Sequence, residues 1–115
     1  MIVRLPGFAP TRSRLVVHNG VIHVVAVAKR VTASMYEQAE GALKALDDSL
    51  AETGSDKHHI LTVTVFISDM QLKADLNRAW DAWASRSAPP LRACLGAALE
   101  PGYMVEMLAT AVQRT

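Results

Sequence analysis

The sequence is poor in cysteine, in excess charge and in aromatic residues, and each shortage narrows what the protein can be. Cys94 is the only cysteine among 115 residues, so no internal disulfide and no cysteine-based zinc site can form, and a reducing, cytoplasmic location is expected. Twelve Lys and Arg residues face 11 Asp and Glu residues, which gives a formal net charge of +1. With this balance, and no Lys/Arg cluster among the few aromatic residues, the sequence predicts no nucleic-acid partner.

Long hydrophobic runs are absent as well. The apolar runs have the length of strands and are broken by His23 or by threonines, so no membrane partner is expected. Residues 1–6 lack the apolar stretch of a signal peptide. Half of the residues are hydrophobic and 20% are charged, which is the composition of a packed globular protein. The length fits a single domain that spans residues 1–115.

The first part of the chain predicts a β-hairpin. Residues 1–10 contain two prolines and a glycine and are expected to be irregular. Residues 13–18 and 21–28 are rich in Val and Ile, as strands are, and Asn19-Gly20 between them is the strongest two-residue hairpin signal. An antiparallel pair of strands is therefore expected.

A helix and a third strand are predicted next. A Ser-x-x-Glu capping box begins at Ser34, and the apolar residues that follow have helical spacing as far as Gly54. Residues 60–68 are β-branched and aromatic, which favours a strand, and residues 68–71 offer the start of a second helix.

The C-terminal part predicts two more strands. Pro89-Pro90 excludes further helix, and the apolar runs 91–99 and 104–112 follow. The resulting order is ββαβαββ, an α+β sandwich of one sheet with two helices on one face. Such an arrangement leaves the other face of the sheet uncovered.

Two of the predicted strands are apolar on both sides. In 21–28 and in 91–99 the alternate positions on either side of the strand are almost all apolar, which is typical of a strand buried on both faces. Two helices on one face cannot cover both. We therefore expect a second subunit to cover the open face.

Five segments keep the order and spacing of a known family: SRLVVHNG (13–20), GSDKHHIL (54–61), VTVFISDM (63–70), NRAW (77–80) and PPLRAC (89–94). From about Arg12 to the end the chain resembles the Rid (YjgF) family, whose founding members are reactive intermediate deaminases. The resemblance implies a chorismate-mutase-like fold and a homotrimer with ligand sites at the clefts between subunits. It also implies hydrolysis of 2-imino or enamine acids to 2-keto acids and ammonia, without a cofactor.

The resemblance points to particular site residues. The family's arginine, which grips the substrate carboxylate, matches Arg92, and a cysteine two residues later matches Cys94. The family's terminal strand reads Glu-Ile-Glu-Ala, whereas residues 106–109 read Glu-Met-Leu-Ala. The first acid is thus kept as Glu106, and Leu108 replaces the second, which positions or activates water in the deaminases.

Other positions differ from the deaminases in the same direction. Arg12 stands where the family has a tyrosine that lines its site, and residues 25–27 replace a Ser-Gly-Gln sequence. A retained arginine without the acid fits an anion-binding pocket better than a standard deaminase, and the chain resembles the branches of the family that lack the acid. The expected substrate-binding residues are Arg92, Cys94, Glu106 and Arg12, and no catalytic residue is assigned.

Plainer interpretations of these residues stand beside the functional ones. Arg92 could be a surface charge or an ion-pair partner of Glu106, and Cys94 could be an ordinary small core residue. Glu106 is either that salt-bridge partner or the remaining polar group of the pocket. Adjacent His58 and His59 would point to opposite faces of a strand, so no metal site is expected.

Three functions are compatible with the sequence. The first is a deaminase-type hydrolase that acts on imines or another small carboxylate and uses Arg92 as the anchor. The second is a non-catalytic trimer that binds a small carboxylate-bearing metabolite and has a regulatory or protective role. The third, a chorismate mutase on the same architecture, has only Arg92 and Arg12 available to grip a dicarboxylate.

Overall fold

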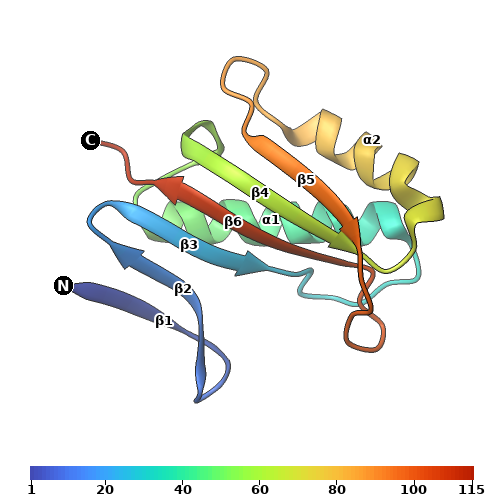
Figure 1. The fold of residues 1–115 in the computed structure, drawn as a ribbon, viewed down its shortest axis with the longest axis horizontal. Coiled ribbons are helices and arrows are strands. Elements are labelled where there is room, and N and C mark those ends of the chain that lie inside the picture. The colour runs from blue at the N-terminus through green and yellow to red at the C-terminus, as the bar shows by residue number, and fades with distance from the viewer.

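A six-stranded sheet forms one layer of the molecule and two helices form the other (Figure 1). The computed structural model describes residues 1–115. The helices are α1 (Met35–Glu52) and α2 (Lys73–Trp83), and the strands are β1 (Ile2–Ala9), β2 (Arg12–His18), β3 (Val21–Ala26), β4 (Ile60–Ile67), β5 (Leu91–Gly96) and β6 (Val105–Val112). The predicted α+β class, with one sheet and both helices on one face, is confirmed. Neither helix has the length and apolar character needed to cross a bilayer.

The strands are arranged in the order β1-β2-β3-β6-β4-β5. All neighbours are antiparallel except β4 and β5, which α2 connects as a crossover on the helical side. Strand β5 therefore lies at one edge of the sheet and the β1–β2 hairpin at the other (Figure 1). Arg92 and Cys94 lie on β5 at one edge, and Arg12 lies on β2 near the other edge. A single subunit therefore does not bring these candidate residues together.

The prediction that residues 1–10 are irregular is wrong. Residues 2–9 form β1, which pairs antiparallel with β2 from Ile2 opposite His18 onward. Proline in this strand is tolerated because β1 is an edge strand and the register shifts at Leu5/Pro6, where no ladder hydrogen bond from the proline is needed. The sheet thus has six strands instead of the five predicted.

The predicted hairpin is confirmed, with Asn19 at φ 51° and Gly20 at φ 79°. Both residues have the positive φ that a two-residue hairpin turn requires. Strand β3 ends at Ala26 and β5 at Gly96, earlier than predicted, because the chain turns away from the sheet after each.

Helix α1 begins at the predicted place, whereas α2 begins at Lys73, a few residues after the predicted start at 68–71. The Ser34 hydroxyl accepts a hydrogen bond from the backbone N–H of Glu37, and α1 ends before Gly54, which has φ 76°. Asp69 caps a short 3₁₀ turn, Met70–Leu72, that leads directly into α2. A capping side chain thus sets the start of α1, whereas α2 continues a capped 3₁₀ turn and has no side-chain cap of its own.

The core lies between the helices and one face of the sheet. It contains 22 buried hydrophobic residues from β2, β3, β4, β6 and both helices. On the other face, called here the open face, Leu91, Leu95 and Leu108 are 68%, 46% and 50% exposed. In one subunit β5 is therefore not buried on both sides, contrary to the simple expectation from its composition, because nothing covers the open face.

One polar side chain is completely buried inside the helical layer. The Nε2 of Gln38 donates to the carbonyl oxygens of Thr32 (2.6 Å) and Gly102 (2.8 Å), and its Oε1 accepts from the backbone N–H of Met104 (2.8 Å). Gln38 thereby fastens to α1 the segment that follows β3 and the loop that precedes β6.

Replacing Gln38 with alanine is expected to lower the free energy of unfolding by about 2 kcal/mol, because three partly buried hydrogen bonds to the backbone are lost and a cavity is left at a fully buried position. Urea unfolding followed by circular dichroism measures the change. Gln113→Ala is the matched control, since the exposed side chain of Gln113 makes one hydrogen bond, to the carbonyl of Thr53. Equal unfolding midpoints for the two variants would contradict the proposed role of Gln38.

Candidate functional site

Arg92 lies at the start of the edge strand β5 and points to the helical side of the sheet. It pairs in register with Val63, which is fully buried on that side. The guanidinium carbon of Arg92 lies 5.2 Å from the ring centroid of Trp80 on α2. No acidic residue forms an ion pair with Arg92, and its hydrogen-bonding fork is not engaged by any protein group. Arg92 is thus a positioned cation without a counter-ion.

The aromatic support under Arg92 is itself held in place. Trp80 is 8% exposed and packs against Trp83, with ring centroids 5.3 Å apart and planes at 56°. The indole N–H of Trp83 donates to Asp47 (2.9 Å), and Lys57 donates to the Trp83 carbonyl (2.6 Å). The two tryptophans are three residues apart on α2, so helical spacing brings them to the same side of the helix. The sequence did not indicate that Trp80 also orients Arg92.

Cys94 lies on the same side of β5 as Arg92, half-buried against the core. Glu106 lies on the opposite face of the sheet, because its neighbours Val105 and Met107 are both buried on the helical side. The ion pair between Arg92 and Glu106 that the sequence left open is therefore not formed within a subunit. Leu108 shares the open face with Glu106.

Arg12 is distant from the other candidate residues within one subunit. It begins β2, and strands β3, β6 and β4 separate β2 from β5. Four strand spacings of ~4.8 Å place the two strands about 19 Å apart. Arg12 lines an open pocket of about 640 Å³ on the β1–β2 hairpin, together with Arg4. Sequence reasoning missed Arg4 because residues 1–10 were expected to be irregular, although the run Ile-Val-Arg-Leu before Pro6 has strand character.

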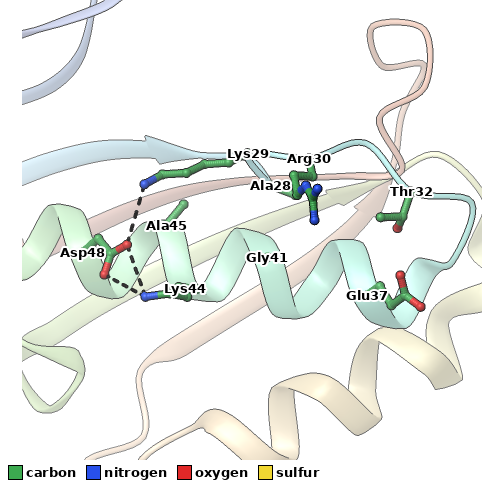
Figure 2. A pocket seen from close by; sticks show the side chains of 9 residues that line it. All are labelled: Ala28, Lys29, Arg30, Thr32, Glu37, Gly41, Lys44, Ala45 and Asp48. Carbon is green, nitrogen blue, oxygen red and sulfur yellow. Dashed lines mark hydrogen bonds and ion pairs between the residues drawn. The ribbon is translucent and has the colours of Figure 1, made fainter.

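A second pocket, of about 310 Å³, lies between α1 and the segment after β3 (Figure 2). Lys29, Arg30 and Lys44 give it positive charge. Asp48 neutralises part of this charge, since its carboxylate lies 3.3 Å from the ammonium of Lys44 and 3.9 Å from that of Lys29 (Figure 2). Its cations are thus largely paired with protein acids.

The histidines at the start of β4 have structural partners. The Nδ1 of His58 contacts the Ser85 hydroxyl (2.9 Å), and the Nδ1 of His59 contacts Asp56 (2.8 Å). That second hydrogen bond holds the pKa of Asp56 below its ordinary value, helped by the backbone N–H of His58 and opposed by partial burial. No group of three His, Cys, Asp or Glu side chains lies close enough together to hold a metal ion.

One sheet covered on one face by two helices is the α+β fold that the resemblance implies, and Arg92 lies on the edge strand of that sheet. The chain belongs to the family described as endoribonuclease L-PSP, which includes the YjgF proteins, because residues 9–113 match it. A RutC family protein of Haemophilus influenzae is 36% identical over 99 residues, covering 84% of this chain and 85% of that protein. The crystal structure of NMB1025, a YjgF family member from Neisseria meningitidis, matches with a TM-score of 0.94 and 36% identity, over 100% of this chain and 97% of that one.

A mammalian relative carries the name of an activity. The 2-iminobutanoate/2-iminopropanoate deaminase of Mus musculus is 34% identical over 83 residues, covering 72% of this chain and 62% of that protein. The predicted family is thus confirmed from two independent directions, sequence and fold.

Proposed function

We propose that this protein binds a small carboxylate in a pocket between the subunits of a homotrimer, with Arg92 as the anchor. The observation that carries the proposal is a guanidinium oriented by Trp80 at a free sheet edge and paired with no acid. A planar guanidinium presents parallel N–H donors that match the two oxygens of a carboxylate. Cys94, two residues along the same side of β5, would line the pocket.

Assembly of subunits is part of the proposal. The open face carries apolar side chains on adjacent strands, with Leu108 directly opposite Val25 in the register and Leu91 and Leu95 on β5. A soluble protein rarely leaves so large an apolar surface in water. A trimer buries it and, because Arg12 and Arg92 lie at opposite ends of one sheet, allows Arg12 of one subunit to approach Arg92 of the next.

The chemistry of imine hydrolysis sets what such a pocket needs. Water adds to the carbon of the C=N bond, and one of its protons passes to the nitrogen. The second proton passes to the nitrogen as the C–N bond breaks, so that ammonia departs and a 2-keto acid remains. A general base or acid must handle these protons, and Leu108 can do neither. Glu106 is the remaining acid on the open face, two residues away on the same side of β6. We therefore place the protein in a branch of the family that lacks the usual acid.

The missing acid separates two versions of the proposed function. In one, the pocket hydrolyses 2-imino acids slowly, with Glu106 as the proton carrier. Because Arg92 and Glu106 lie on opposite faces of the sheet in one subunit, this version requires Glu106 to come from a neighbouring subunit. In the other, which the leucine at position 108 favours, the trimer binds a carboxylate metabolite without chemistry and has a regulatory or protective role.

The trapping of 2-iminopropanoate tests the proposed function. An amino-acid oxidase generates the imine, semicarbazide traps it, and added protein lowers the trapping rate if it hydrolyses the imine. We expect the unmodified protein to hydrolyse the imine ~10²–10⁴-fold more slowly than an enzyme that has the acid, because a general acid or base typically contributes a rate factor of this size. Leu108→Glu should raise the rate by about tenfold, since residue 12 and residues 25–27 still differ from the deaminases.

Leu108→Gln is the matched control, because it introduces a polar group of the same size that cannot carry a proton at this step. Light scattering must show both variants in the assembly state of the unmodified protein. Equal rates for the two variants would exclude a proton-transfer role for position 108. Efficient hydrolysis by the unmodified protein would show that another group replaces the acid, with Glu106 as the first candidate to mutate.

A further inference from the structure

The pocket on the β1–β2 hairpin has a composition unlike the rest of the surface. Its nine lining residues include Arg4 and Arg12, the hydroxyl residues Thr11 and Ser13, and no Asp or Glu. Arg4 lies on the open face, because it pairs in register with Val16, whose neighbours Leu15 and Val17 are both buried on the helical side. Arg4 therefore lies on the same face as the proposed subunit contact.

The two arginines of this pocket lack protein counter-ions. Arg4 makes no hydrogen bond or ion pair, and the one partner of the Arg12 guanidinium is the hydroxyl of the adjacent Thr11, at 3.1 Å. Half of the other ten Lys and Arg residues are paired with acids: Arg14 with Glu52, Lys29 and Lys44 with Asp48, Arg78 with Asp75, and Arg114 with Asp56. Two guanidiniums that share a pocket without an acid repel each other, and a bound anion relieves that repulsion.

The pocket of Figure 2 provides the contrast. It holds three cations, but Asp48 bridges two of them and Glu37 also lines it. An anion would have to compete with Asp48 there. In the hairpin pocket no protein carboxylate competes.

We infer that the Arg4–Arg12 pocket binds the doubly charged group of a small ligand, either a phosphoryl group or a pair of neighbouring carboxylates. Each guanidinium can take two oxygens through parallel N–H donors, and the hydroxyls of Thr11 and Ser13 are additional donors. A single carboxylate has too few oxygens to engage both arginines in this way. The pocket is thus expected to bind a doubly charged group with three or more oxygens more tightly than a single carboxylate.

This inference deepens the proposed function and rests on it only for one step, the approach of Arg12 to Arg92 of a neighbouring subunit. If that step holds, the ligand carries a carboxylate at Arg92 and a second anionic group at the hairpin pocket. Anion binding at the hairpin itself requires only residues of β1 and β2 and the turn between them.

Thermal unfolding of the full chain, in a buffer free of phosphate and at constant ionic strength set with NaCl, tests the inference. Inorganic phosphate and malonate are the probes, and acetate is the singly charged control. At 10 mM, phosphate or malonate is expected to raise the Tm by about 5 °C, and acetate by much less. The larger of the two shifts identifies whether the pocket prefers a phosphoryl group or a dicarboxylate.

Arg4→Gln and Arg12→Gln should each weaken the binding of malonate or phosphate about tenfold in calorimetric titration, which removes most of the Tm shift. Without added anion, neither substitution should lower the Tm, because each relieves repulsion. Arg86→Gln is the matched control, since Arg86 is exposed, has no ion-pair partner and lies outside both pockets. It should leave the shifts unchanged.

Other outcomes overturn the inference. Equal shifts with acetate, or an equal loss in Arg86→Gln, would mean that the anions act on the overall surface charge. Dissociation of the assembly by Arg4→Gln or Arg12→Gln in anion-free buffer would mean that the pocket receives an acidic side chain of a second copy. Arg92→Ala should leave the rise in Tm with phosphate unchanged. A loss of monocarboxylate binding in Arg92→Ala therefore tests the proposed function, and a loss of the Tm rise in the Arg4 or Arg12 variants tests the hairpin pocket.

Discussion

Val25→Asp is expected to convert the proposed trimer into monomers at micromolar concentration. Val25 is half-buried on the open face and lies opposite Leu108 of β6 in the register. In a trimer that buries this face, the substitution would place three uncompensated carboxylates in an apolar interface, and each costs several kcal/mol. Multi-angle light scattering measures the mass directly.

Ala74→Asp is the control for this experiment. Ala74 is exposed on α2, in the layer on the other side of the sheet, so the same added charge should leave the mass unchanged. A monomer mass for the unmodified protein would refute the trimer outright. A trimer that tolerates Val25→Asp would mean that the subunits meet through another surface.

Arg92→Ala is expected to weaken the binding of small carboxylates by about tenfold to hundredfold, because a hydrogen-bonded charged anchor is lost. The protein should remain folded. The substitution removes the contact of the guanidinium with Trp80, which is worth about 0.5–1 kcal/mol at a partly exposed position. Isothermal titration calorimetry with pyruvate or 2-oxobutanoate measures the loss of binding, and the Tm of each protein measures the loss of stability.

Arg92→Lys is the informative companion. It keeps the charge but loses the planar fork, so binding should fall between the wild-type and alanine proteins. If Arg92→Ala unfolds the protein, the residue has a structural role and the assignment of the pocket is wrong. Unchanged binding in the alanine variant would also exclude Arg92 as the anchor.

Local signals in the sequence were sufficient for most of the fold. Asn19-Gly20 fixed the hairpin, Ser34 and Gly54 marked the ends of α1, and the apolar runs 60–68, 91–99 and 104–112 indicated the remaining strands. The first strand could not be found this way, because proline and glycine indicate a loop unless the strand lies at a sheet edge. Edge position is a property of the whole sheet and has no local signature.

The candidate site was predictable as a set of residues but not as an arrangement. Alternation along each strand places Arg92 with Cys94, and Glu106 with Leu108. Whether two different strands present these pairs to the same face depends on the register between them. The pairing of Arg92 with Val63 and of Glu106 with Phe66 decides that question, and it puts the arginine and the acid on opposite faces.

The contact between Arg92 and Trp80 gives the protein an intrinsic optical reporter. Trp80 and Trp83 are its two tryptophans, and they lie against each other, so nearly all indole emission originates within one side chain of the candidate anchor. A cation over an indole ring alters the electric field at the excited ring. An anion that neutralises or draws away the Arg92 guanidinium therefore changes the emission spectrum without any label. Ligand screening can then proceed on the unmodified chain, with Arg92→Ala as the blank.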